Sequence, residues 1–87
     1  MKRSNLAQMK QCVSDLVAIA TASRDHEQAK ARIKELLDEA KFQDGSFSTA
    51  RRLRDQLRAV YEDLETTSAK QFLAELIEWL EAKRLRD

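Results

Sequence analysis

The stretch Phe42-Gln43-Asp44-Gly45-Ser46-Phe47 contains the only glycine of an 87-residue chain that has no proline. Long segments with a helical spacing of apolar residues lie on either side, so this stretch is where the chain can reverse direction. Gly45 tolerates a positive φ and can end a helix, and a serine after it can accept from the free N–H groups that open the next helix. We therefore predict a turn between two helical hairpins, with Phe42 and Phe47 folded back over the core.

Apolar residues that recur every three or four positions predict four amphipathic helices, at about 5–22, 25–41, 48–64 and 68–85. Ser23 or Asp25 starts the second predicted helix, and Asp25 with Gln28 three residues later matches a capping box. Thr66, Thr67 and Ser68 offer caps to the fourth. Short loops favour antiparallel neighbours. The predicted fold is all-α: one domain over residues 1–87, an antiparallel up-down-up-down four-helix bundle. The centres of the four apolar arcs predict the core residues Leu6, Met9, Val13, Leu16, Ile33, Leu36, Leu53, Leu57, Val60, Phe72, Leu73, Leu76 and Leu80.

Composition limits the location and the partners of the chain. Apolar residues make up 43% and charged residues 36%, as in a soluble helical bundle, and a net charge of +1 argues against a general polyanion binder. Ser14 and Asp15 interrupt the one segment that resembles a signal peptide, and no apolar run approaches the roughly 20 residues of a membrane span. Cys12 is the only cysteine, which excludes an intramolecular disulfide. We expect a cytoplasmic protein with no membrane insertion.

His26 and Cys12 are the only candidates for enzyme chemistry. Antiparallel packing of the first two helices would separate them by about 12 Å, at a rise of about 1.5 Å per residue, so they cannot act as a pair. We expect Cys12 to be a small core residue and His26 to be a partly exposed residue near the start of the second helix. The chain has no phosphate-binding glycine loop, no Ser-His-Asp set and no paired Glu-x-x-His motif. We therefore expect no catalytic residue, no cofactor and no metal.

A basic run occupies the first half of the third predicted helix. It consists of Arg51, Arg52, Arg54 and Arg58. Three of these, Arg51, Arg54 and Arg58, share one helical flank with Phe47 and Tyr61. Such a mixture of arginine and aromatic side chains can meet phosphates and bases. The structural alternative is a solvated face with Arg51–Asp55 and Arg58–Glu62 ion pairs four residues apart.

The charges of this helix oppose its dipole. Arginines lie near its positive N-terminal end and Glu62, Asp63 and Glu65 near its negative C-terminal end, each placement costing about 0.3 to 1 kcal/mol at an exposed site. In the predicted bundle, the end that contains the 42–47 turn and both termini has ten basic and six acidic residues, an excess of four positive charges. The opposite end has three basic and seven acidic residues, an excess of four negative charges. The sequence therefore predicts an electric dipole with a basic end.

Two apolar residues of the fourth predicted helix lie off its core face. Trp79 lies at the margin, where core filling is the default role but a tryptophan can also anchor a partner. Leu85 lies outside the core arc, beside Arg84 and Arg86. The predicted partner-binding residues are Arg51, Arg54, Arg58, Tyr61, Trp79 and Leu85.

These features predict a small non-catalytic protein–protein interaction module. It would bind another protein with an acidic surface through the basic end and a few apolar anchors. Inhibitors, immunity proteins and adaptors fit this description, and the scaffold alone is similar to that of the four-helix immunity proteins of bacteriocin producers. The alternative is a nucleic-acid-binding regulatory protein that uses the surface formed by Arg51, Arg52, Arg54 and Arg58. The sequence leaves a homodimer open.

Overall fold

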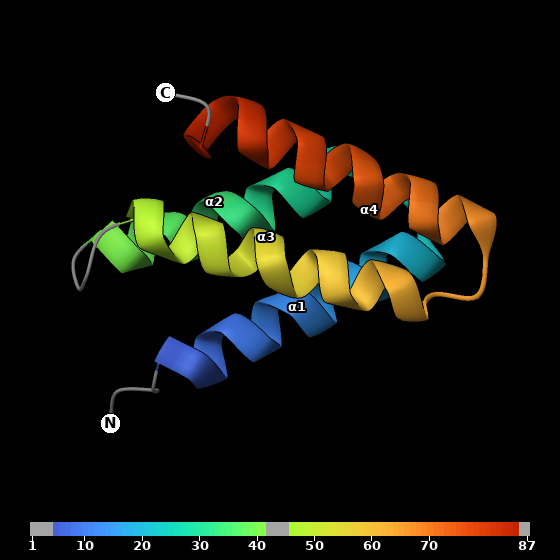
Figure 1. Ribbon diagram of the computed structural model, residues 1–87, viewed down its shortest axis with the longest axis horizontal. Helices are drawn as coiled ribbons and strands as arrows, with labels where there is room; N and C mark the ends of the chain where they lie inside the picture. The colour runs from blue at the N-terminus through green and yellow to red at the C-terminus, as the bar shows by residue number, and fades with distance from the viewer. Residues whose placement is uncertain (1–4, 42–45, 86–87) are drawn as a thin grey trace.

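The computed structural model describes residues 5–41 and 46–85, and within these residues it is all-helical (Figure 1). The elements are α1 (Asn5–Ala22), α2 (His26–Lys41), α3 (Ser46–Asp63) and α4 (Thr67–Leu80), followed by the short π-helical segment η1 (Glu81–Leu85). The prediction of an all-helical protein with four main helices is confirmed, and each predicted start lies within two residues of the observed one. The ribbon reverses direction from each α-helix to the next (Figure 1). No helix in this part of the chain combines the length and the apolar character needed to cross a bilayer.

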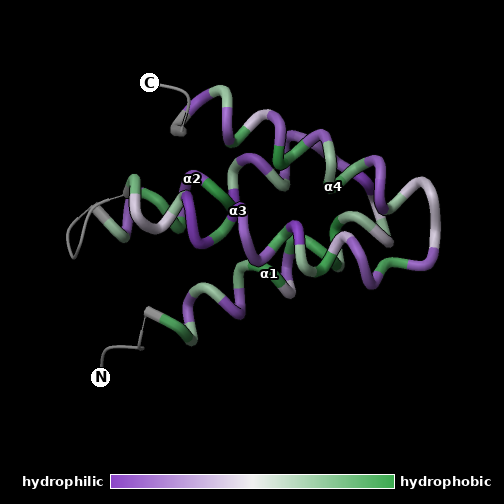
Figure 2. Tube along the Cα trace, in the orientation of Figure 1, coloured by the Kyte–Doolittle hydropathy of each residue, from purple (hydrophilic) through white to green (hydrophobic). Residues whose placement is uncertain are grey.

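One hydrophobic core lies between the four helices and contains most of the predicted residues. Hydrophobic and hydrophilic positions alternate along each helix, as amphipathic periodicity requires (Figure 2). Leu16, Leu53 and Leu57 are fully buried, and each leucine removed from water in this way contributes about 1.5 to 3 kcal/mol. Of the predicted core residues, only Leu6 and Val60 are not buried, and Val60 still packs against the core while half-exposed.

Two predictions about apolar residues near helix starts are wrong. Leu6, predicted in the core, is 61% exposed, and Phe47, predicted to cover the core, is 51% exposed. Leu6 lies in the first turn of α1 and Phe47 in the first turn of α3. In Figure 1 the start of α1 diverges from α3, and Leu6 stays exposed there, whereas Met9, three residues later, is buried. The predicted roles of Phe42 and Gly45 lie outside the described residues.

The connection from α1 to α2 contains one strained residue. Arg24 has a φ of 50°, the left-handed region that costs a non-glycine residue about 1 to 2 kcal/mol. The carbonyl of Ile19 accepts from the backbone N–H groups of both Ser23, at 3.1 Å, and Arg24, at 2.7 Å. These two hydrogen bonds satisfy a carbonyl at the end of α1 and hold Arg24 in this conformation.

Side chains cap the starts of α2 and α4. Oδ1 of Asp25 accepts from the backbone N–H groups of Glu27, at 3.0 Å, and Gln28, at 3.2 Å, which confirms the predicted cap of α2. Oγ1 of Thr66 accepts from the N–H of Ala69 at 3.4 Å and caps α4. Both loops are therefore fixed at the residues where the sequence predicted helix starts.

Candidate functional site at the basic end

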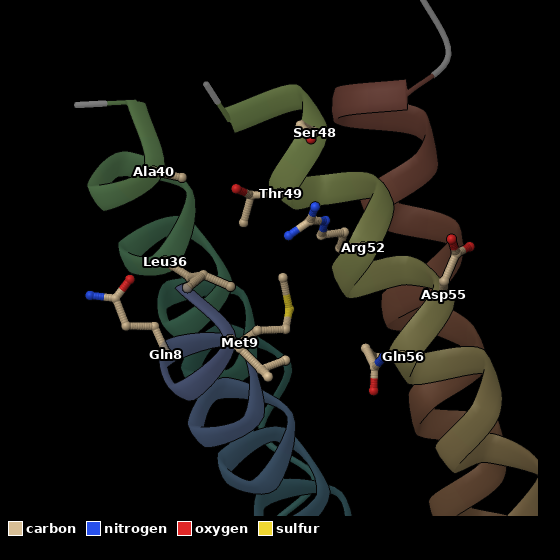
Figure 3. Close-up of a pocket in the computed structure, with 10 residues that line it drawn as sticks. Gln8, Met9, Leu36, Ala40, Ser48, Thr49, Arg52, Asp55 and Gln56 are labelled. Carbon is tan, nitrogen blue, oxygen red and sulfur yellow. The ribbon is translucent and has the colours of Figure 1, made fainter. Parts of the chain in front are cut away.

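A groove lies between α1 and α3 at the end of the molecule where both helices begin and α2 ends. We call this end the basic end and this feature the α1–α3 groove (Figure 3). The groove has a volume of about 480 Å³ and is open on one side. Its lining residues are Leu6, Gln8 and Met9 from α1, Leu36 and Ala40 from α2, and Ser48, Thr49, Arg52, Asp55 and Gln56 from α3.

The groove has an apolar floor and a polar wall. Met9 and Leu36 are buried at its base, where α1 packs on α2, and exposed Leu6 extends the apolar surface toward the start of α1. Arg52 reaches from α3 into the space between the helices (Figure 3). On the opposite side, Gln8 Nε2 donates to Glu39 Oε1 at 2.7 Å and joins α1 to α2. The groove therefore offers an apolar side chain a place to dock beside a guanidinium group.

Two arginines at the basic end have no side-chain partner in the part of the chain that the structure describes. Arg51 and Arg52 are exposed, and neither side chain forms an ion pair or a hydrogen bond with any described residue. Arg54 differs, because its Nη2 lies 3.2 Å from Asp55 Oδ1 and its side chain is 21% exposed. A planar guanidinium with free N–H groups matches a carboxylate, so Arg51 and Arg52 can receive an acidic partner.

Arg58 and Tyr61 lie elsewhere, on the surface between α3 and α4. Arg58 Nη2 is 3.1 Å from Glu81 Oε2, and Lys70 Nζ lies 5.4 Å from the centroid of the half-buried Tyr61 ring. The shallow hollow around Arg58 and Tyr61 also contains three carboxylates, those of Glu62, Glu78 and Glu81. Arg58 therefore already has acidic neighbours, and neither Arg51 nor Arg54 lines this hollow.

The ion pairs of α3 differ from those that the spacing predicted. Among the described residues, Arg54 pairs with Asp55 and Arg58 pairs with Glu81 of η1, in place of the expected Arg51–Asp55 and Arg58–Glu62 pairs. An i,i+4 spacing allows an ion pair within one helix, but Arg58 pairs with a carboxylate on the neighbouring element. Arg51 has no carboxylate partner among the described residues.

Trp79 does not line the groove. Trp79 is half-buried against the core, on the surface shared by α2 and α4, and Lys30 Nζ lies 5.6 Å from the centroid of its ring. The side chain of Leu85 lies outside the described part of the chain. The predicted partner-binding residues whose side chains are described are therefore not one site. None of them lines the α1–α3 groove: Arg58 and Tyr61 share the hollow beside α4, and Trp79 lines a hollow beside α2.

Cys12 and His26 have separate surroundings. Cys12 is fully buried in the core, as predicted, and burial raises the pKa of its thiol to about 11. His26, the first residue of α2, has its Nε2 2.9 Å from Glu75 Oε1 and its ring 4.6 Å from that of Phe72. No three or more His, Cys, Asp or Glu side chains within residues 5–41 and 46–85 are grouped so that they could hold a metal ion.

The predicted partner-binding residues did not include Arg52, because the prediction favoured the flank of Arg51, Arg54 and Arg58. Arg52 was named as a binding residue only in the nucleic-acid alternative. Thr49, Arg52 and Gln56 form a stripe at i, i+3 and i+7 that faces the groove. That spacing was visible in the sequence, next to the apolar stripe of the same helix. The sequence could not show that the first turns of α1 leave this stripe uncovered.

Comparison with known proteins identified no relative of this chain. No protein-family model matches the chain, and no curated protein and no solved structure matches it either.

Proposed function

We propose that this chain is a small, non-catalytic protein–protein interaction module of the inhibitor, immunity or adaptor type, acting in the cytoplasm. Its helices would form an antiparallel up-down-up-down four-helix bundle, and its basic end would dock on an acidic surface of the partner. The basic end supports this proposal more strongly than the other surfaces because it combines exposed apolar side chains with unpaired cations.

The observation that carries the proposal is the position of Leu6 and Phe47. They are the large hydrophobic residues that are exposed in the described part of the chain, and both lie at the basic end. Arg51 and Arg52 lie on the next turn of α3 after Phe47. Apolar anchors flanked by charge are typical of a surface that is covered by another protein.

The occupant that fits the α1–α3 groove is an acidic amphipathic helix of the partner. A helix can lay its apolar face between α1 and α3, with one large side chain directed toward Met9 and Leu36. Carboxylates on the flank of that helix would then face Arg51 and Arg52, whose guanidinium groups have no partner among the described residues. Charge complementarity of this kind mainly accelerates association and fixes orientation.

The surroundings of the two candidate catalytic groups support a non-catalytic role. A thiol with a pKa of about 11 is protonated at neutral pH, and Cys12 is fully buried. His26 lies against Phe72 and Glu75, on a different part of the molecule. A nucleophile needs a base within hydrogen-bonding reach, and this pair does not supply one.

The nucleic-acid alternative has less support. It relied on four arginines acting as one surface, but Arg54 and Arg58 contact the carboxylates of Asp55 and Glu81. Two unpaired guanidinium groups beside an apolar groove suit a protein better than a phosphate backbone, which is bound by extended rows of cations.

Affinity capture from the source cells with matched variants tests the proposal. Wild-type protein should retain an acidic protein, the Arg51→Gln/Arg52→Gln variant should lose it, and the control Lys30→Gln/Lys34→Gln, which removes two charges from another surface, should retain it. With the purified partner, the arginine variant should associate more slowly and with a weaker salt dependence. Equal retention by the two variants, or capture that nuclease treatment abolishes, would contradict the proposal.

A further inference from the structure

A second hollow lies on a different surface, between α2 and the C-terminal end of α4 with η1. Its volume is about 440 Å³. Its apolar base contains Leu37 and the ring of Trp79, and its remaining lining residues are Glu27, Lys30, Lys34 and Lys83. Three ammonium groups and one carboxylate therefore face a single concave surface, and we call it the lysine hollow.

The three lysines of the hollow have no carboxylate partner among the described residues. Elsewhere on the same helix the chain does neutralise its cations: Arg32 Nε lies 2.9 Å from Asp15 Oδ2. Lys30 and Lys34 are four residues apart on α2, a spacing at which like charges repel each other. Glu27 is the one carboxylate that lines the hollow, so two of its three positive charges remain for an anion to neutralise.

Trp79 holds one of these charges in place without neutralising it. Lys30 Nζ lies 5.6 Å from the centroid of the indole ring, in range of a cation–π contact. An ion pair would cancel the charge of the ammonium group, whereas a cation–π contact leaves it available to an anion. Lys83 reaches the hollow from η1, one turn beyond Trp79, so the cations come from two elements of the structure.

We propose that the lysine hollow binds an oligophosphate, a chain of two or more phosphate groups that is either inorganic or part of a nucleoside di- or triphosphate. Lysine ammonium groups bind phosphate as point charges, whereas the arginines of the basic end suit planar carboxylates. A phosphate chain carries charge along its length and can meet ammonium groups on both α2 and η1. This site is separate from the α1–α3 groove and does not depend on the proposed protein partner.

Trp79 is the only tryptophan of the chain and reports on the hollow directly. Titration with sodium tripolyphosphate, without divalent cations, should change its fluorescence in a saturable way, with an apparent Kd that rises with salt. Lys34→Gln/Lys83→Gln should weaken binding by about tenfold or more, because it removes two charge-assisted contacts to the phosphate chain. Both lysines are exposed, so the melting temperature of this variant should stay close to that of the wild type.

The control variant is Arg51→Gln/Arg52→Gln, which removes the same charge from another surface. It should leave tripolyphosphate binding unchanged within about twofold, because neither arginine lines the hollow. Titration with ATP distinguishes an inorganic oligophosphate from a nucleotide as the ligand. Similar affinities for ATP and tripolyphosphate indicate that the phosphate chain alone is recognised, and tighter binding of ATP indicates that the base and sugar contribute. Isothermal titration calorimetry detects binding that leaves the fluorescence unchanged.

Three results would overturn the proposal. The first is an absence of saturable tripolyphosphate binding by both fluorescence and calorimetry. The second is equal weakening in the lysine and arginine variants, which would indicate a general charge effect. The third is binding of an oligothymidylate with no binding of tripolyphosphate or ATP, which would assign the hollow to single-stranded nucleic acid.

Discussion

Replacing Leu57 by alanine tests the central contact of α3. Leu57 is fully buried in the core, and the substitution removes three carbon atoms. At about 0.8 kcal/mol per buried carbon the transfer contribution is about 2.4 kcal/mol. The cavity that remains raises the loss in unfolding free energy to about 3 to 5 kcal/mol, depending on how far the neighbouring helices relax.

This loss is large for a protein of this size. A domain of 87 residues has an unfolding free energy of about 4 to 13 kcal/mol, at about 0.05 to 0.15 kcal/mol per residue. The melting temperature should therefore fall by about 12 °C or more, at about 4 to 8 °C per kcal/mol. Urea denaturation followed by circular dichroism measures the change, provided that the dependence of the free energy on urea stays the same.

Leu6→Ala is the matched control, because periodicity alone assigned both leucines to the core. Leu6 is 61% exposed, so the same substitution there should cost about 1 kcal/mol or less and leave no cavity. A loss below about 1 kcal/mol for Leu57→Ala, or equal losses at the two positions, would refute the packing described for α1 and α3.

Three further predictions concern single residues. Arg24→Gly should stabilise the protein by about 0.5 to 1 kcal/mol because glycine accepts a φ of 50° without strain, whereas Arg24→Ala, which also removes the charge, should give no gain in thermal denaturation. Asp25→Ala should cost about 0.5 to 2 kcal/mol through the lost cap of α2, and a cost near zero in the same assay would show that the two hydrogen bonds of Asp25 do not stabilise the helix. The folded pKa of Cys12 is about 11, above the ordinary value of about 8.5. The contribution of this thiol to the unfolding free energy is therefore complete below about pH 8 and is lost as the pH rises toward 11. Denaturant melts at increasing pH should show a smaller loss of unfolding free energy for the Cys12→Ala variant than for the wild type.

The sequence predicted the parts of the fold that depend on local chemistry. The caps provided by Asp25 and Thr66 and the fully buried Leu53 and Leu57 follow from residue types and from the spacing within one helix. Such features do not depend on where the neighbouring helix lies. For that reason the helix starts and most of the core could be predicted.

The candidate site depends on how the helices diverge, which periodicity does not specify. An apolar stripe shows which face of a helix prefers burial, but Leu6 stays exposed because α1 separates from α3 at that end. Tertiary packing likewise determines which carboxylate an exposed arginine can reach, as the contact between Arg58 and Glu81 shows. The π-helical turn η1 had no signal in the residue pattern of the fourth helix.

The most direct test of the proposed function is to map the surface that an acidic partner covers. Backbone amide chemical shifts of the labelled chain, measured with and without the captured partner, locate that surface residue by residue. The proposal predicts that the changes concentrate at the α1–α3 groove, including Leu6, Met9 and Arg52. Changes concentrated instead around Arg58 and Tyr61, or around Trp79, with the groove unaffected, would contradict it.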